Sequence, residues 1–261
     1  MKIRVSTALL FLANFVSFPA FALPDKVGDF ALLDSDGEFH QLSRYRHKEF
    51  VVLMAVDPAC EDLSHELAVF NEIEKEWNAR GVSFTTVSAD GEENLAALQK
   101  TKKDLGIAQP FMLDTGQIVS ATLRLGHAGQ TVVLDPHRLT ILYRGPISGL
   151  GDVLNDAKTA GMETTKDLPM TGCDLSFSKL DGLAEMVPDY AEDVAPIIMD
   201  QCTSCHREGG IGPFSMDSHL MLKGWSPMIR EVLLTKRMPP MQVDPDIGHF
   251  SNARYLPTDQ L

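Results

Sequence analysis

Two cysteines and a histidine at fixed spacing are the most chemically specific feature of this sequence. Cys202 and Cys205 are three residues apart, and His206 follows directly. In a Cys-x-x-Cys-His arrangement both thiols add to the vinyl groups of one porphyrin, while the imidazole binds its iron from one side. One helical turn brings both sulfurs to the same face. The motif therefore predicts one covalently attached c-type haem.

Half of a zinc site and a thioredoxin-type dithiol are the alternatives for the same residues. Zinc needs two further Cys or His ligands at short spacing, and the neighbouring sequence has no second pair. A redox dithiol is expected directly after a buried strand at the start of a helix, whereas a helical pattern precedes Cys202. Haem attachment agrees better with the sequence than either alternative.

A sixth iron ligand is expected downstream of His206. A thioether sulfur would raise the potential of a haem iron towards the range used in electron transfer. We favour Met238, because it ends an amphipathic stretch over residues 229–237 and two prolines then force an extended chain. Met241 is the alternative. The other downstream methionines fit core positions better: Met216, Met221 and Met228.

The remaining two cysteines, Cys60 and Cys173, form a second candidate redox site. Cys60 follows an apolar strand and precedes a helix, a place where the helix N-terminus lowers the pKa of a thiol. It has no Cys two residues away, so Cys173 is the partner that remains. In an oxidising compartment such a pair usually closes. A structural disulfide worth about 4 kcal/mol, a redox-switching bond and a free reactive thiol all stay open.

The elements that position these residues follow from the apolar pattern. From residue 27 to about residue 160 short apolar strands alternate with amphipathic helices, which predicts an α/β sheet with a thioredoxin-like order of elements. Strands are expected over residues 30–33, 39–42, 50–56, 82–89, 111–113, 131–135 and 139–145. Helices are expected over residues 62–80, 94–104, 118–125 and 150–160.

Four segments are expected along the chain. Residues 1–22 combine a basic start, a short apolar run and an Ala-Phe-Ala cleavage site, which predicts a secretory signal peptide. The thioredoxin-like domain follows over residues 23–160, then a linker rich in Thr, Asp, Gly and Pro over residues 161–189. Short helices over residues 190–261 predict a small all-α, cytochrome c-like domain. We therefore expect a periplasmic or secreted protein that does not span the membrane after signal cleavage.

The charge balance narrows the choice of partner. The chain has 36 acidic and 23 basic residues, a formal net charge of −13. Nucleic-acid binding needs clustered Lys and Arg, so this composition argues against a nucleic-acid partner. An acidic surface suits the steering of a basic redox partner, or serves solubility alone.

Several runs after Gln201 resemble the cytochrome c segment of bacterial redoxin–cytochrome fusions, of the kind associated with copper type II monooxygenase-like proteins. The runs are Cys-Thr-Ser-Cys-His-Arg-Glu-Gly-Gly-Ile-Gly-Pro-Phe-Ser, Ile-Arg-Glu-Val, Arg-Met-Pro-Pro and Phe-Ser-Asn. The resemblance implies that Met238 is the distal haem ligand and puts Met241 where the family has Trp. The family continues with a terminal helix, whereas this chain stops at Leu261, so we expect the haem domain to be C-terminally incomplete.

A weaker resemblance, over residues 24–176, is to AhpC/TSA-type redoxins, a group that includes peroxiredoxins and Sco-type copper proteins. Asp57 replaces the attacking Cys of the usual motif, and His127-Ala-Gly stands where a cis-proline is expected. Similar redoxins carry a Gly-Cys near the linker, as at Cys173. Sco-type proteins carry a copper-binding His near the position of His127. This implies copper as a second cofactor, held by Cys60 and His127 with Asp57, although Ser64 replaces the second Cys of that motif.

These observations favour an exported electron-transfer protein that carries one haem c beside a degenerate thioredoxin-like domain. Its electrons would pass to a redox partner protein or to a fused or neighbouring oxidoreductase domain. The alternatives are a thiol-dependent oxidoreductase or peroxidase that uses Cys60 and Cys173, a Sco-like copper-binding module, and a redoxin half that serves only for docking.

Overall fold

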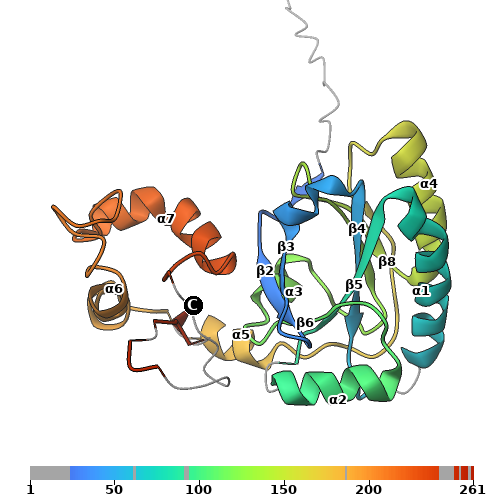
Figure 1. Cartoon of the computed structure of the whole chain (residues 1–261), viewed down its shortest axis with the longest axis horizontal. Coiled ribbons are helices and arrows are strands. Elements are labelled where there is room, and N and C mark those ends of the chain that lie inside the picture. Colours follow the sequence, from blue (N-terminus) through green and yellow to red (C-terminus); the bar gives the residue numbers. More distant parts are fainter. Residues whose placement is uncertain are drawn as a thin grey trace, which may run out of the picture.

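The structure is a computed structural model with two lobes, a larger one built on a sheet and a smaller helical one (Figure 1). It describes residues 24–60, 63–90, 94–185, 187–240, 250–252, 254–257 and 260–261. The signal peptide expected over residues 1–22 lies outside the described residues. Within them, no helix has the length and apolar character that a membrane crossing requires.

Nine strands among the described residues form one mixed sheet in the larger lobe. Their order is β1-β8-β7-β4-β5-β6-β2-β3, and β9 pairs with the outer side of β8. β4, β5 and β6 are parallel neighbours, whereas β7 runs antiparallel to both β4 and β8. The strands are β1 (Asp25–Lys26), β2 (Ala31–Asp34), β3 (Phe39–Gln41), β4 (Phe50–Val56), β5 (Val82–Ser88), β6 (Phe111–Leu113), β7 (Thr131–Asp135), β8 (Thr140–Gly145) and β9 (Lys166–Asp167).

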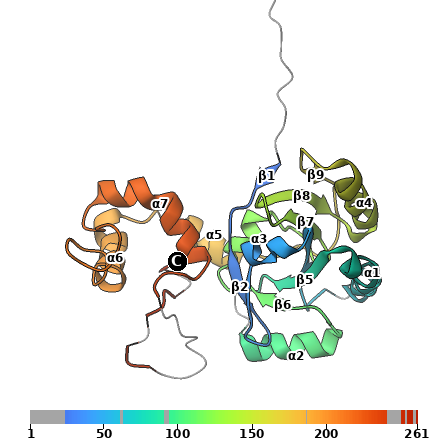
Figure 2. The same cartoon turned by 45° about the horizontal axis from the view of Figure 1, so that its top comes forward.

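Helices cover both faces of this sheet, as Figure 2 shows. α1 (Leu63–Trp77) and α4 (Leu150–Ala160) cover one face, and the short α3 (Ile118–Thr122) lies over the other. α2 (Leu95–Leu105) adds Leu98 to the first face. The central strand β4 is buried at every residue because its side chains alternate between the two apolar clusters. These elements form the α/β thioredoxin-like fold that the sequence predicts.

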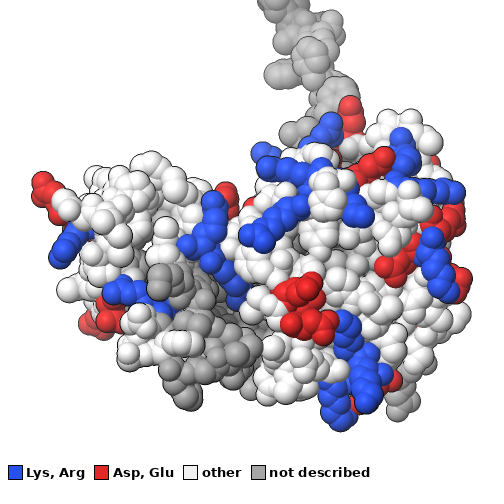
Figure 3. Space-filling model, viewed as in Figure 1, with Lys and Arg blue, Asp and Glu red and all other residues white. Residues whose placement is uncertain are grey.

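The smaller lobe is helical and has very little apolar core. It contains a π-type turn (Tyr190–Val194), α6 (Ala195–Gln201) and α7 (His219–Leu234). Among its described residues, proline aside, the buried apolar side chains are Met216 and Leu222. All large exposed apolar side chains of the described chain belong to this lobe: Val187, Met199, Ile211, Leu220, Met221, Trp225, Met228, Phe250, Tyr255 and Leu261. Its visible face in Figure 3 is largely uncharged.

The lobes meet at the C-terminal end of α7. Leu234 packs against the apolar cluster under α3, and the Arg230 guanidinium lies 3.4 Å from the Thr122 hydroxyl. A cavity of about 80 Å³ at this contact is lined by residues of both lobes, among them Asp114 and Lys236. The connection between the lobes therefore includes packing as well as the covalent chain.

Two regions differ from the sequence prediction. Residues 161–189, expected to be a linker, contain β9 and α5 (Ser178–Ala184). β9 forms because the Leu168 amide donates to the Arg144 carbonyl and the Arg144 side chain binds Asp167, both of which are long-range contacts. The helix expected over 118–125 ends at Thr122. The cytochrome c-like domain stays a prediction, since the structure shows a helical region without settling its type.

Candidate redox site

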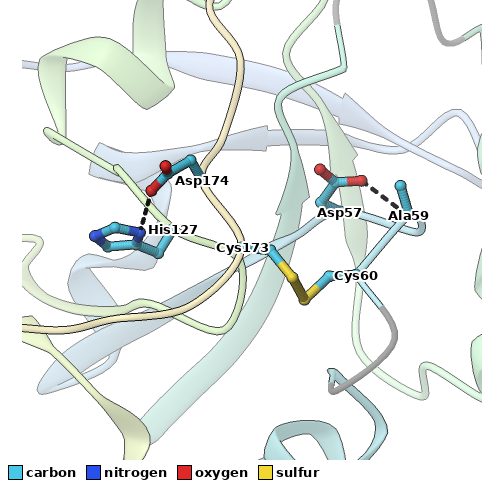
Figure 4. Close-up of a disulfide and its surroundings, with 6 residues drawn as sticks. All are labelled: Asp57, Ala59, Cys60, His127, Cys173 and Asp174. Atoms are coloured by element: carbon cyan, nitrogen blue, oxygen red, sulfur yellow. Dashed lines mark hydrogen bonds and ion pairs between the residues drawn. A yellow bond between two sulfur atoms is a disulfide. The ribbon is translucent and has the colours of Figure 1, made fainter.

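A disulfide between Cys60 and Cys173 joins the end of β4 to the segment after β9 (Figure 4). The two Cα atoms are 5.9 Å apart, a separation that a disulfide normally spans. Cys60 lies in a turn between β4 and α1, in which its amide donates to the Asp57 carbonyl at 3.1 Å. The Asp57 carboxylate accepts a hydrogen bond from the Ala59 amide at 2.9 Å. Asp57 therefore shapes the turn that presents the sulfur.

The segment around Cys173 runs antiparallel to the loop before β7. The Ala128 amide donates to the Cys173 carbonyl, and the Leu175 amide donates to the Gly126 carbonyl, both at 2.9 Å. Between these bonds His127 Nδ1 lies 2.9 Å from Asp174 Oδ1, as Figure 4 shows. Backbone pairing and a close side-chain contact thus hold Cys173 opposite Cys60.

The loop over residues 126–130 is fixed from within and by β4. Gln130 Oε1 accepts hydrogen bonds from the amides of Gly126, at 2.7 Å, and His127, at 3.3 Å. The Gly129 amide donates to the Ala55 carbonyl at 2.8 Å. Gly129 has φ = 78°, a conformation that favours glycine. The loop that replaces the expected cis-proline is therefore held rigidly beside the end of β4.

The disulfide lies in partly apolar surroundings next to the start of α1. Both cysteines are partly buried and pack against the apolar cluster between the sheet and α1. α1 begins three residues after Cys60. The sequence left open whether this pair closes, and in the structure it is closed.

The proposed copper ligands are not brought together. In this oxidised form the Cys60 sulfur is bonded to Cys173, and His127 faces Asp174 instead. Among the described residues, the group of three donor side chains close enough for a metal ion is a different one: Asp34, Glu38 and His40. Copper binding at His127 stays a prediction.

The group around Asp34 is a polar network that sequence reasoning missed. His40 Nε2 lies 2.9 Å from Asp34 Oδ2, and His40 Nδ1 lies 2.6 Å from the Tyr45 hydroxyl. Burial, together with the charge of Asp34, raises the pKa of Tyr45 to about 12. Asp34 Oδ1 also accepts hydrogen bonds from the amides of Asp36 and Glu38, and these bonds close the hairpin turn. This network stabilises the β2–β3 hairpin, and only the strand register could have revealed it.

The Cys-x-x-Cys-His motif directly follows α6. The amides of Cys205 and His206 both donate to the Cys202 carbonyl, at 3.1 Å and 2.9 Å, so the motif continues as one helical turn. Both cysteines are free thiols and partly buried. Burial raises the pKa of the Cys202 thiol, an effect that the nearby Arg254 partly offsets.

His206 is buried with one ring nitrogen already bonded. The residue is only 7% exposed, and its Nδ1 lies 3.0 Å from the Phe214 carbonyl oxygen. Because a carbonyl can only accept, Nδ1 carries a proton, and in the neutral ring Nε2 is then the nitrogen with the lone pair. A Cβ on Gly212 would lie 2.6 Å from His206 Nδ1, so the chain passes too close for any side chain there.

A cavity of about 640 Å³ lies in the helical lobe, within the size range of sites for small molecules and cofactors. Its lining is mostly apolar and includes Ile198 of α6, Leu222 of α7 and Ile118 of α3. Cys202, Cys205, His206 and Met238 do not line it. Met238, the predicted sixth ligand, is partly buried just beyond α7, where its amide donates to the Val232 carbonyl at 3.1 Å. Met241 lies outside the described residues.

Comparisons with known proteins agree on the class of the larger lobe. Residues 23–142 match the model of the AhpC/TSA family. The first part of the chain is thus similar to AhpC/TSA proteins, in agreement with its thioredoxin-like fold. The match does not extend to the helical lobe, and no curated protein matches the chain.

Solved structures cover between 54% and 61% of this chain. An uncharacterized conserved protein from Geobacillus kaustophilus is 20% identical with a TM-score of 0.50, over 61% of this chain and 94% of that one. A hypothetical protein from Sinorhizobium meliloti 1021 is 16% identical with a TM-score of 0.49, over 59% and 94%. Peroxidoxin BcpB from Mycobacterium tuberculosis is 19% identical with a TM-score of 0.44, over 54% and 98%.

Proposed function

We propose that the chain is an exported redox protein whose thioredoxin-like domain exchanges electrons through Cys60 and Cys173. The observation that carries this proposal is the disulfide itself, formed at the junction of β4 and α1. A thiol at such a junction is activated by the helix N-terminus. The redoxin fold of residues 23–142 supports the same role.

The exchange reaction uses both cysteines in turn. In the reduced protein, the Cys60 thiolate attacks one sulfur of a partner disulfide, and the other partner sulfur leaves as a thiolate. Cys173 then loses its proton and attacks Cys60 in the mixed disulfide. The Cys60–Cys173 bond forms again, and the partner leaves as a dithiol that has gained two electrons and two protons. A dithiol donor must then reduce the protein for the next cycle.

A redox titration tests this proposal. The full chain is equilibrated in glutathione buffers of graded potential, quenched with acid and alkylated. The masses of the peptides that contain Cys60 and Cys173 are then measured by mass spectrometry. We expect a midpoint between about −120 and −270 mV, the range of thiol oxidoreductases. A midpoint below about −300 mV would identify a purely structural disulfide and contradict the proposal. A Cys173→Ser chain, in which the bond cannot form, calibrates the fully reduced signal.

The second candidate function is electron transfer through a c-type haem in the helical lobe. The specific observation is the hydrogen bond between His206 Nδ1 and the Phe214 carbonyl, because ligand histidines usually have such an orienting bond on the nitrogen that does not bind metal. The donor set fits: Cys202 and Cys205 would anchor the haem, and His206 and Met238 would bind its iron. Once bound, the group would supply reversible one-electron transfer.

The packing of the lobe supports this second candidate. Proline aside, the described part of this lobe has two buried apolar side chains, Met216 and Leu222, which is less than the core that normally stabilises a domain. His206, already oriented by the loop around Gly212, would be positioned before binding. A redox partner protein, or a fused or neighbouring oxidoreductase domain, would then exchange electrons with this lobe.

Export in a host that assembles c-type cytochromes tests the second candidate. We expect the mature chain to gain the mass of one haem and to give a reduced-minus-oxidised difference spectrum. The sulfur-to-iron charge-transfer band of the oxidised form should disappear in Met238→Ala and persist in Met241→Ala. A colourless chain with the mass of its amino acids alone would exclude this function.

A further inference from the structure

One backbone edge of the redoxin domain forms hydrogen bonds with the segment that carries Cys173. In the loop over residues 126–130, the amides of Gly126 and His127 bond to Gln130, and that of Gly129 bonds to β4. The Ala128 amide and the Gly126 carbonyl instead bond to the Cys173 segment. If that segment leaves, the Ala128 amide and the Gly126 carbonyl lose their hydrogen-bond partners beside Cys60. Backbone groups without partners cost free energy, so these two groups favour a replacement strand.

We propose that residues 173–176 occupy a binding site for an extended, cysteine-containing peptide of a partner protein. In the oxidised chain this segment adds as a short antiparallel strand to the edge formed by residues 126–128 (Figure 4). Opening of the Cys60–Cys173 bond frees the edge for the partner. This inference rests on the proposed thiol–disulfide function and names the class of its substrate.

The contacts of the segment define the residues that the site prefers. His127 Nδ1 lies 2.9 Å from the Asp174 carboxylate, which favours an acidic residue directly after the cysteine. Leu175 packs against both apolar clusters of the domain, which favours an apolar residue one position further on. A partner peptide of the form Cys-acidic-apolar therefore matches the site.

A buried glutamine completes the site at its far end. Gln117 is 1% exposed, and its Nε2 donates to the Ser176 carbonyl at 2.8 Å and to the Ala89 carbonyl at 2.7 Å. Its Oε1 accepts from the Lys179 amide at 3.0 Å. Because Gln117 is anchored to Ala89, the residue directly after β5, it stays in place when the segment leaves and can bind the backbone of an incoming peptide.

In the bound complex the chemistry is a single exchange step. The Cys60 thiolate attacks the cysteine sulfur of the peptide, which arrives in a disulfide, and the second sulfur of that disulfide leaves as a thiolate. A mixed disulfide between Cys60 and the peptide results, in the place that Cys173 holds in the structure. Cys173 is then the residue that releases the peptide.

Hydrogen exchange tests whether the segment leaves. Amide exchange of the full chain is compared by mass spectrometry before and after reduction of the disulfide. We expect residues 173–179 and 126–128 to exchange at least about tenfold faster in the reduced chain, while β4 and β5 keep their protection. Unchanged exchange in both segments would overturn the proposal.

A peptide reaction tests recognition. A nonapeptide with the sequence of residues 170–178, its cysteine joined to thionitrobenzoate, is mixed with a full chain that carries Cys173→Ser, and release of the chromophore is followed. A second peptide has proline at the position of Leu175, which removes the N–H that donates to Gly126. We expect the first peptide to react about 3- to 10-fold faster, the effect of one hydrogen bond. Adding Leu175→Pro to the chain weakens its own segment and should increase the rate further.

The two outcomes that contradict this inference differ in what else they exclude. Equal rates for the two peptides would overturn peptide recognition and leave the thiol–disulfide function intact. A Cys60 that reacts with neither peptide would overturn both. A third peptide, with lysine at the position of Asp174, should react more slowly, since a lysine ammonium cannot accept from the His127 ring as a carboxylate can.

Discussion

At the scale of single residues, His206 is held mainly by backbone. The Phe214 carbonyl accepts from its ring at 3.0 Å, and its own carbonyl accepts from the Met216 amide at 2.9 Å. The chain at Gly212 passes against the imidazole. A ring fixed in this way loses little freedom when it binds a metal, which is how a ligand becomes preorganised.

We predict that Gly212→Ala lowers the covalent haem content of the exported chain several-fold. The new Cβ would lie 2.6 Å from His206 Nδ1, so either the ring or the loop must move. Gly224→Ala is the matched control, because nothing lies within 4 Å of a Cβ at that helical position. The measurement is haem absorbance per unit of protein. Equal contents in the two variants would contradict the prediction.

Asp114 is a buried carboxyl whose contribution to folding stability we predict to depend on pH. It is 3% exposed, and burial raises its pKa above the usual 3.8, although the Ser120 amide and the charge of Lys236 oppose the shift. The folded chain therefore binds this proton more tightly than the unfolded chain. Its contribution to stability is present below pH 3.8 and is lost as the pH rises towards the folded pKa.

Asp114→Asn should therefore become more stable relative to the native chain as the pH rises from about 4 to 7. Urea unfolding at several pH values measures the difference. Asp36→Asn is the control, since a hydrogen bond from Lys102 lowers the pKa of this exposed carboxyl and the trend should be weak and opposite in sign. A parallel pH dependence of the Asp114→Asn and native chains would contradict the expectation.

At the scale of elements, what the sequence could reveal depended on the range of the contacts. The central strands and α1, α2 and α4 were predictable because their apolar periods are local. β9 was not, because it depends on Arg144 reaching Asp167. The Cys-x-x-Cys-His motif is likewise contiguous and could be recognised, whereas the Phe214 carbonyl that orients His206 comes from a later turn. The pairing of Cys173 with Cys60 could be proposed only by elimination.

The disulfide between β4 and the segment after β9 closes a loop over a sequence separation of 113 residues. We predict that Cys60→Ser, Cys173→Ser and the double variant each lose about 4 to 5 kcal/mol of unfolding free energy, the chain-entropy value for a loop of this length. The three losses should be nearly equal, because either substitution alone removes the bond. Urea unfolding measures them. Additive losses in the double variant would show that the cysteines stabilise the fold separately.

At the scale of the whole molecule, the two lobes differ in how they are stabilised. Both buried apolar clusters belong to the larger lobe, and the helical lobe adds Leu234 to one of them. We predict that residues 24–185 alone fold and keep the Cys60–Cys173 bond, with a cooperative thermal transition. Residues 187–261 alone should show little helical signal unless haem is attached. Circular dichroism of both fragments checks this, and a cooperative transition in the haem-free second fragment would contradict it.

The place of Cys173 between the two lobes gives the disulfide a mechanical consequence. While the bond is closed, the chain is anchored to the redoxin domain at least as far as Lys179, whose amide donates to Gln117. Once it opens and the strand detaches, the last sheet anchor is β9, which ends at Asp167. Residues 168–176 then join the free tether, and at full extension they add roughly 30 Å of reach. The oxidation state of two sulfur atoms would thus set how far the helical lobe can swing to meet a partner.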